Sequence, residues 1–470
     1  MPQAQTVAVP TRLPLVIEAE NRDETTSKDA KLINAYVEKN PRTEEYWIFK
    51  RPGLLQYGST LSGVGRGVYN WQGDIYSIFG SVLYANGVSV ATGLDTTNGV
   101  YRFSQCLGAT PRLQLGNGTV TYNYDSGAGL VAMSGVNLPS PAVKGIGYLD
   151  GKIYLLNADS EVRGTGGLND PTDWSDATNT LTAQIEPDPA VFLAKQLVYI
   201  LVLSQWSTEV FYDAANPSGQ SPLGPVQGAK VNYGCVNGDS VQEIDGNLFW
   251  LATNRSSAVQ VMMLENLKPL VVSTKPIERL LNDVVDFTSV YSFGLKLEGH
   301  RFYGFSLPND NLTLVYDMSD RMWSQWTDSA GNYFPIVSST YAVSTGRIVQ
   351  HATNGKLYNL DYNYDTDDGA VITVDIVTPN FDGGTRRRKQ LNIMEFIADQ
   401  TPGSVLSVRS NDSDYQADKW TNFRQVDLNM KKPILANNGT FMRRAYHFRH
   451  QCNAPLRIQA VELQIDIGTL

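Results

Sequence analysis

The chain has 470 residues, of which 42% are hydrophobic and 18% are charged, and its formal net charge is −9. A hydrophobic fraction of this size excludes an intrinsically disordered chain, and the acidic balance argues against a protein that coats nucleic acid, because such proteins are normally basic. The 40 glycines and 24 tyrosines favour a turn-rich, all-β protein over a helical one.

The cysteines and the hydropathy pattern indicate the cellular compartment in which the chain is made. Cys106, Cys235 and Cys452 lie far apart and form no paired motif, which predicts a reduced chain without a disulfide framework. Residues 1–20 lack a basic start followed by an apolar core, and the sequence holds no run of 18 apolar residues. We therefore expect neither a secretory signal nor membrane insertion, and assembly in a cytoplasm.

Residues 1–60 precede the repeated part of the sequence and are predicted to form an arm followed by the first strands. Met1–Ile17 is uncharged apart from Arg12 and carries three prolines. Leu32–Val37 and Tyr46–Phe49 have the composition of strands. Two roles are open for this region: it closes the last repeat, or it packs on a neighbouring subunit.

Residues 61–366 repeat one pattern, a short turn followed by a strand of aromatic and aliphatic residues. Seven copies follow one another at steps of 33 to 56 residues, namely Gly73–Ile78, Gly118–Tyr124, Gly151–Leu156, Gln196–Val202, Gly246–Leu251, Gly299–Phe305 and Gly355–Leu360. Propeller blades recur at roughly 40–50 residues. The region is therefore predicted to be a β-propeller of about seven blades, with six to eight possible.

One helical signal interrupts these repeats. Lys275–Leu281 has a proline near what would be the first turn of a helix, followed by glutamate and two leucines. We predict a short helix here, on a connection between two blades.

The repeats end near residue 367, and residues 367–470 show longer, more widely spaced strands. The predicted strands are Ala370–Thr378, Gln390–Ala398, Ser404–Arg409, Arg443–Arg449 and Pro455–Ile467. This pattern predicts a separate C-terminal β-sandwich.

The residues that could carry catalysis form no recognisable motif. The four histidines, at 300, 351, 447 and 450, stand in none of the usual hydrolase or metalloprotease settings. A glycosidase needs two facing carboxylates, but Asp170–Trp174 and Asp317–Trp323 do not match a sialidase-type Asp box. We interpret Trp174 and Trp323 as residues packed between blades, and we predict no enzyme activity, no catalytic residue and no cofactor.

A possible calcium loop follows the last repeat. Asp361, Asn363, Asp365, Asp367 and Gly369 place oxygen ligands at alternate positions, as calcium loops do. The sixth position, however, is a threonine where such loops need glycine, and the final glutamate is missing. A linker between domains is the preferred interpretation, and no metal is predicted.

Two basic segments are the candidate contact sites. In Phe441–His450, strand alternation places Arg443, His447 and Arg449 on one face and Arg444, Tyr446 and Phe448 on the other. The candidate residues of the two segments are Arg386, Arg387, Arg388, Lys389, Arg443, Arg444 and Arg449. We prefer a subunit interface, where arginine and tyrosine are enriched, and keep contact with DNA phosphates as the alternative.

The order of several short segments resembles a known family. These segments are Asn34–Glu38, Lys50–Leu54, Val64–Gly67, Ser81–Tyr84, Asp367–Ile372, Arg443–Arg457 and Ala460–Ile465. The chain is similar, from about residue 30 to its end, to the tail nozzle or tail-hub proteins of short-tailed bacteriophages, also called distal head-to-tail connector or packaged-DNA stabilisation proteins.

The resemblance implies a structural protein of the virion tail, with a propeller and a β-sandwich. Six copies would ring the tail axis below the portal adaptor, extend the DNA exit channel, retain the packaged genome and seat tail fibres, spikes or a plug. Double-stranded DNA would only pass through, which suits an acidic ring. Two other functions stay open: a tail-associated propeller that binds or cleaves host glycan, and a soluble cytoplasmic scaffold.

Overall fold

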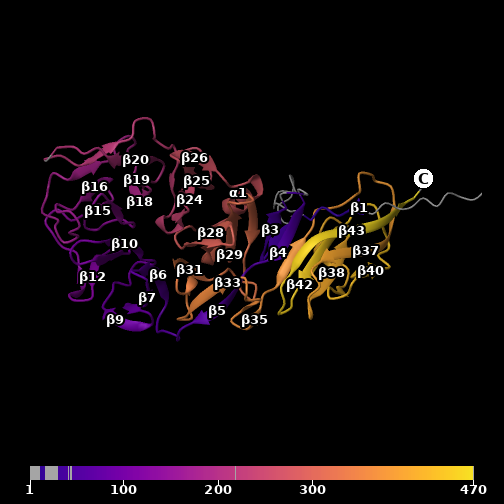
Figure 1. Cartoon of the computed structure of the whole chain (residues 1–470). Coiled ribbons are helices and arrows are strands. Elements are labelled where there is room, and N and C mark those ends of the chain that lie inside the picture. The colour runs from indigo at the N-terminus through magenta and orange to yellow at the C-terminus, as the bar shows by residue number, and fades with distance from the viewer. Residues whose placement is uncertain (1–10, 16–29, 41, 43–44, 218, 469–470) are drawn as a thin grey trace, which may run out of the picture.

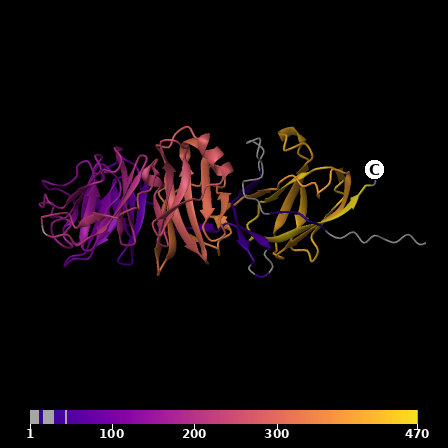
Figure 2. The same cartoon turned by 90° about the horizontal axis from the view of Figure 1, so that it is seen from above.

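The computed structural model describes residues 11–15, 30–40, 42, 45–217 and 219–468. Figures 1 and 2 show two bodies side by side: a ring of sheets, which is a β-propeller, and a second body that holds the last strands of the chain. Strands dominate both bodies, and the described part contains one α-helix, α1 (Lys275–Asn282), and the 3-10 turns Gly238–Ser240, Pro308–Asp310 and Ala417–Lys419. No described helix is long and apolar enough to cross a membrane.

Six sheets of the described chain belong to the ring alone. Four have four strands each: β6 (Gly65–Trp71), β7 (Asp74–Phe79), β8 (Val82–Ala85) and β9 (Val88–Thr92); β10 (Arg102–Cys106), β11 (Arg112–Gly116), β12 (Thr121–Asp125) and β13 (Gly129–Ala132); β14 (Gly147–Leu149), β15 (Lys152–Leu156), β16 (Glu161–Gly164) and β17 (Thr180–Thr182); β18 (Ala190–Gln196), β19 (Tyr199–Ser204), β20 (Thr208–Asp213) and β21 (Leu223–Pro225). The fifth holds β22 (Gly234–Cys235), β23 (Gln242–Ile244), β24 (Asn247–Thr253), β25 (Gln260–Glu265) and β26 (Lys268–Val271). The sixth holds β31 (Ile336–Ala342), β32 (Gly346–His351), β33 (Leu357–Asp361), β5 (Gly53–Tyr57), β34 (Thr366–Asp367) and β35 (Ala370–Val371).

A nine-stranded sheet continues from the ring into the second body. Its strands in spatial order are β27 (Tyr291–Leu297), β28 (His300–Leu307), β29 (Leu312–Asp317), β30 (Met322–Gln325), β2 (Lys31–Ile33), β36 (Val374–Val377), β42 (Ala445–His450), β38 (Val405–Asn411) and β39 (Arg424–Asp427). β2 is the strand that joins the two parts, because it pairs in parallel with β30 and antiparallel with β36.

The second body is completed by a seven-stranded sheet. Its strands are β3 (Ala35–Lys39), β4 (Tyr46–Lys50), β43 (Arg457–Ile467), β37 (Lys389–Ala398) and β40 (Ile434–Ala436), with β1 (Thr11–Arg12) beside β43 and β41 (Thr440–Phe441) beside β37. Ile48 of this sheet and Phe448 of the nine-stranded sheet are both inaccessible to solvent and share one hydrophobic cluster. The core of the second body therefore lies between its two sheets.

The repeated turn of the sequence is a two-residue hairpin. Asp150 and Gly151 have φ angles of 47° and 83°, and Asp245 and Gly246 have 53° and 81°. Positive φ at both central positions is the geometry of a type I′ turn, which matches the twist of the strands that it connects. In five of the seven repeats the turn reverses the chain from the inner strand of a sheet to the next strand outward, while Gly118 and Gly355 lie between the second and third strands of their sheets.

Hydrophobic clusters between neighbouring sheets hold the ring together. Trp174 is 2% exposed in the cluster between the β10 and β14 sheets, and Trp323 is 3% exposed beside α1; the two tryptophans are thus core residues. Val68 of β6 and Ile348 of β32 share the cluster that closes the ring between its first and last sheets. Burial of these faces is the main stabilising term of such a fold.

The expected helix and the C-terminal strands are confirmed. α1 begins with proline in its first turn and lies between β26 and β27, with Ile277 and Leu281 buried. β36, β37, β38, β42 and β43 lie within or overlap the predicted C-terminal strand ranges.

The first strands of the chain contribute to both bodies. β5 pairs with β33 and supplies the fourth strand of the last ring sheet, between β33 and β34. β3 and β4 pair within the seven-stranded sheet of the second body, and β2 pairs with β30 of the ring on one side and β36 on the other. The predicted arm at residues 1–20 lies largely outside the described residues.

Candidate functional site at the junction of the two bodies

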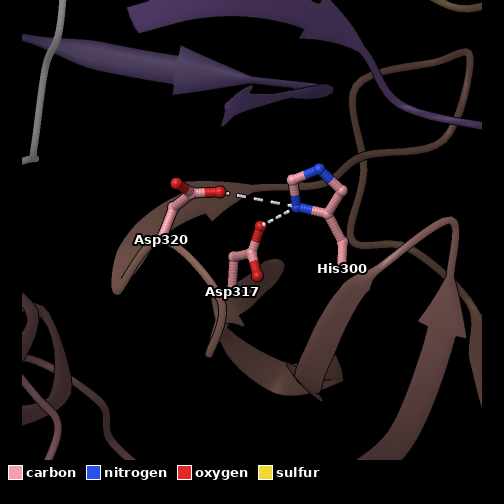
Figure 3. A group of neighbouring side chains, drawn as sticks. All are labelled: His300, Asp317 and Asp320. Carbon is pink, nitrogen blue, oxygen red and sulfur yellow. Dashed lines mark hydrogen bonds and ion pairs between the residues drawn. The ribbon is translucent and has the colours of Figure 1, made fainter. Parts of the chain in front are cut away.

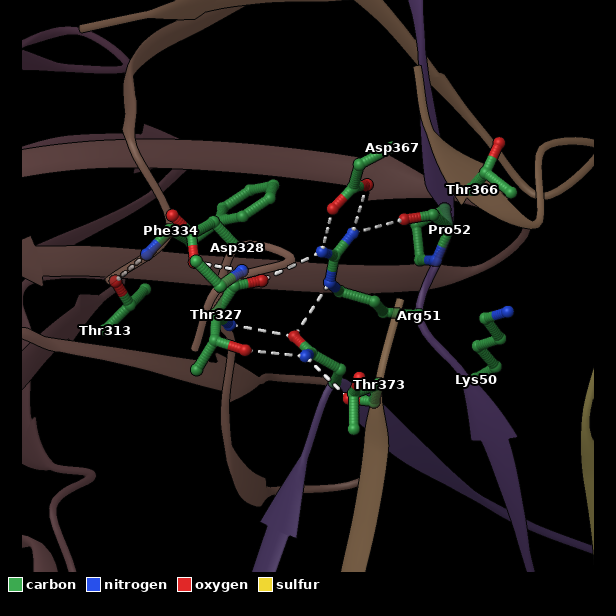
Figure 4. A network of polar contacts seen from close by, with 12 residues as sticks. Lys50, Arg51, Pro52, Thr313, Thr327, Asp328, Phe334, Thr366, Asp367 and Thr373 are labelled. Atoms are coloured by element: carbon green, nitrogen blue, oxygen red, sulfur yellow. Dashed lines mark hydrogen bonds and ion pairs between the residues drawn. The ribbon is translucent and has the colours of Figure 1, made fainter. Parts of the chain in front are cut away.

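A buried arginine joins the ring to the second body. Arg51, which follows β4, is 1% exposed. Its guanidinium donates to both carboxylate oxygens of Asp367, at 2.9 and 2.5 Å, and to the carbonyl oxygen of Thr327 at 2.9 Å (Figure 4). Its Nε donates to Asn34 Oδ1 at 2.9 Å. A bidentate pair of this kind fixes geometry as well as charge.

Asn34 extends the same network. It has a φ of 55° between β2 and β3, a conformation that asparagine tolerates better than most residues. Its side-chain amide donates to Thr327 Oγ1 at 2.7 Å and to the Thr373 carbonyl at 2.8 Å, and its Oδ1 accepts from the Thr327 amide at 2.8 Å. One side chain therefore holds the ends of β30 and β36 at the first strands.

Lys50 forms a second link next to Arg51. Its ammonium donates to the carbonyl oxygens of Asp365 at 2.7 Å, Cys452 at 2.9 Å and Ala454 at 3.1 Å. Burial lowers the pKa of Lys50 to about 8. The three carbonyls use all three donors of the ammonium, so this side chain ties the linker after β33 to the last turn of the second body.

The loop tested as a calcium site is part of this junction. Asp367 binds Arg51, and Asp361 accepts hydrogen bonds from the backbone and side-chain amides of Asn363, both through Oδ1. The described residues contain one group suited to a metal ion, and it includes none of the loop residues. The side-chain oxygens of Asp367 and Oδ1 of Asp361 therefore accept hydrogen bonds from protein donors.

The two basic segments lie beside each other in the second body. β37 pairs with β41, and Lys389 lies opposite Phe441. The Lys389 ammonium donates to three carbonyl oxygens, including that of Met442 at 3.0 Å. Lys389 is therefore buried and used within the chain. Arg386, Arg387 and Arg388, by contrast, are exposed.

The arginines near β42 differ in their surroundings. Arg444 is 6% exposed, stacks on Phe441 and pairs with both carboxylate oxygens of Asp412 at 2.6 and 2.9 Å. Arg443 is half-buried and lies 3.2 Å from Asp414. Each of the two therefore has an acidic partner in its own chain.

The predicted alternation is confirmed for the four residues that lie in β42, whereas Arg443 and Arg444 precede the strand. His447 and Arg449 both reach Asp375, at 2.6 and 2.7 Å, while Tyr446 and Phe448 belong to the core. Burial alone would raise the pKa of Asp375, but the hydrogen bonds from His447 and Arg449 bring it below its ordinary value.

The ring encloses a central cavity of about 580 Å³. Its described lining comes mainly from the inner strands and includes Tyr69, Tyr148, Arg102 and Lys195, but no tryptophan. Glu243 is the acidic residue among those lining residues, and burial raises its pKa. Hydrolysis of a glycoside needs a pair of carboxylates, so this lining does not favour that chemistry.

Sequence reasoning did not assign a role to Asn34, Lys50 or Arg51. All three occur in segments that carried the family resemblance, where Lys50-Arg-Pro precedes a strand. The partners of Asn34 and Arg51, among them Thr327 and Asp367, are about three hundred residues away along the chain, and Cys452, a partner of Lys50, is about four hundred away. Nothing local in the sequence indicates such contacts.

Comparison with known proteins gives one informative match. A family model described as "Bacteriophage P22 Gp10, beta-propeller" matches residues 12–365. No curated protein matches the chain.

Several solved structures are similar to the chain, all with TM-scores under 0.5. A streptogramin B lyase is 9% identical, with 70% of this chain and 98% of that chain covered and a TM-score of 0.39. The N-terminal domain of Nup159 is 10% identical, with 71% and 99% covered and a TM-score of 0.40. BamB from Moraxella catarrhalis is 10% identical, with 75% and 98% covered and a TM-score of 0.39.

Proposed function

We infer the function from the family: the chain belongs to that of the bacteriophage P22 Gp10 β-propeller, the tail nozzle and DNA-stabilising proteins of short-tailed phages. We propose that it is a non-enzymatic structural protein of the virion tail. In this proposal six copies form a nozzle below the portal adaptor, retain the packaged DNA until ejection, and anchor tail fibres, spikes or a plug.

The family match is the observation that carries the proposal, and the charge of the chain is consistent with it. Each copy has a net charge of −9, so a ring of six copies would place a large negative charge around the channel. Like charge lets a polyanion pass without adhering to the wall. DNA is therefore a transient occupant of the channel rather than a bound ligand.

The junction supports a role in a closed ring. Arg51, Asn34 and Lys50 connect the two bodies through buried and partly buried hydrogen bonds, which hold the second body against the ring. Closed rings need two different faces of each subunit to meet. The exposed Arg386–Arg388 segment and an acidic surface of the next copy would form such a contact by charge complementarity.

We also propose a finer description of the fold. Counting β27–β30 with the six separate ring sheets gives seven blades, and the seven hydrophobic clusters between neighbouring sheets support that count. The two facing sheets around Ile48 and Phe448 support the interpretation of the second body as a β-sandwich.

Deletion of the gene from a phage tests the proposal. We expect capsids that carry portal and adaptor but have lost their DNA, and electron microscopy with DNA quantification measures that loss. Complementation in trans should restore full particles. Full capsids that fail only to adsorb would contradict the proposal and would instead favour the receptor-binding, glycan-recognising class.

A further inference from the structure

His300, Asp317 and Asp320 converge at the edge of the ring that faces the second body (Figure 3). His300 Nδ1 lies 2.6 Å from Asp317 Oδ2 and 3.6 Å from Asp320 Oδ2. One ligand atom from each residue lies within 4.8 Å of the other two. The imidazole and the Asp317 carboxylate are 9% and 4% exposed, and Asp320 is 15% exposed.

Backbone amides orient the two carboxylates. Asp317 Oδ1 accepts from the Ser319 amide at 2.9 Å, and Asp320 Oδ1 accepts from the Lys39 amide at 3.2 Å. In both residues Oδ2 is the atom that faces His300 Nδ1. A single N–H cannot serve two carboxylates well, whereas a cation in that position can bind both.

The charges of this cluster are unbalanced. Glu38 Oε2 of β3 lies 4.0 Å from His300 Nε2, so three carboxylates face one imidazole, and no lysine or arginine of the described chain forms an ion pair with any of them. The buried pair of His447 and Asp375 in the second body differs, because Arg449 neutralises that aspartate at 2.7 Å. Carboxylates crowded without a cation are unfavourable unless protons or a metal ion are bound.

We propose that His300 Nδ1, Asp317 Oδ2 and Asp320 Oδ2 bind a divalent transition-metal ion of the zinc type. An imidazole nitrogen with carboxylate oxygens suits Zn²⁺, while Ca²⁺ and Mg²⁺ prefer all-oxygen sets. Zinc lies about 2.0–2.2 Å from such ligands, so the Asp317 carboxylate, whose Oδ2 is 2.6 Å from His300 Nδ1, rotates away from the imidazole when the ion binds. Glu38, whose Oε2 is 4.0 Å from His300 Nε2, then faces the other ring N–H, the position that outer carboxylates of zinc histidines take.

The proposed site borders a cavity through His300, and Asp320 is partly open to solvent, with 15% of its side chain exposed. His300 and Glu38 line a cavity of about 260 Å³ at the junction, together with Lys50 and Asp399. Asp320 also accepts from the backbone of β3. Metal bound here would therefore brace the β29–β30 turn of the ring against the first strands of the second body, a stabilising role that is independent of DNA retention.

Titration of the chelator-treated full chain with ZnCl2, followed by calorimetry, tests the site. We expect one saturable Zn²⁺ per chain, unaffected by equal concentrations of MgCl2 or CaCl2, and a higher melting temperature with Zn²⁺ than without. Asp320→Asn should weaken Zn²⁺ binding by at least about tenfold, because loss of a direct ligand costs no less than loss of an outer hydrogen-bond partner. Asp399→Asn is the matched control, since this carboxylate lines the same cavity but pairs with Arg457 at 2.7 Å, and it should bind Zn²⁺ like the wild type.

A second variant keeps the test decisive if Asp320→Asn fails to fold. Glu38 is 47% exposed, so Glu38→Gln should fold normally and bind Zn²⁺ more weakly than the wild type. No saturable binding by the wild-type chain would overturn the site, as would wild-type affinity in Asp320→Asn or in Glu38→Gln. Competition by CaCl2 would overturn the assignment to a transition metal.

Discussion

Replacement of Arg51 by methionine should destabilise the protein more than any surface substitution. The variant keeps the aliphatic stem but removes five described hydrogen bonds, to Asn34, Pro52, Thr327 and the two oxygens of Asp367. Breaking a buried ion pair by removing one partner costs about 3–5 kcal/mol, because the other charge is left unpaired. We expect a loss of this size in the free energy of unfolding.

Urea unfolding at equilibrium, followed by tryptophan fluorescence, measures this loss. Lys356→Ala is the matched control: Lys356 pairs with Asp368, the residue next to Asp367, at 2.9 Å, but both side chains are about 30% exposed. A pair of that kind contributes no more than about 1 kcal/mol. The double variant Arg51→Met/Asp367→Leu should recover part of the loss, because it leaves no buried charge unpaired. An Arg51→Met variant as stable as Lys356→Ala would refute the reasoning.

Three further predictions concern closure of the ring, assembly and pH. Leu54 and Leu55 are neighbours in β5 but are 6% and 47% exposed, so Leu54→Ala should cost about 2–5 kcal/mol in chemical unfolding and Leu55→Ala about 0.5 kcal/mol or less; equal losses would mean that β5 does not close the ring. Replacing Arg386–Arg388 with glutamine should leave the melting temperature unchanged but reduce ring formation on portal–adaptor particles in electron microscopy, and normal rings would count against a role at the interface. Burial lowers the pKa of His450 from 6.5 to about 4. The unfolded chain therefore takes up a proton first as the pH falls, and stability is lost between about pH 6.5 and 4; His450→Gln should flatten melting temperature against pH in that window, and an unchanged profile would exclude this histidine as the cause.

The ring was predictable because its signal is local. Each repeat encodes a turn at residues such as Asp150 and Gly151 and the strand that follows it, and both are read from a short window. The helix at 275–282 was predictable for the same reason, since proline marks its first turn. The alternation in β42 follows from the two-residue period of a strand.

The junction and the histidine cluster were not predictable in the same way. The role of Arg51 depends on its contacts with Thr327 and Asp367, which pairings between distant strands bring close to it. Lys50 and Arg444 are ordinary basic residues in the sequence, and only burial shows that their charges are used inside the chain. In the sequence, Asp317 stood out only as part of a segment that does not match an Asp box. Its contact with His300 was not visible there, because His300 lies on the preceding strand, 17 residues earlier.

The pairing of the first strands with the last has a consequence for synthesis. β4 can pair with β43 only after the chain has been synthesised to residue 467, and β5 can pair with β33 only after it has been synthesised to residue 361. While the ribosome is still translating the repeats, both early strands expose unpaired edges, and contacts of such long sequence separation form slowly. We therefore expect truncated chains to aggregate through these unpaired strand edges. Aggregated chains cannot be incorporated, so incomplete chains are excluded before the particle assembles.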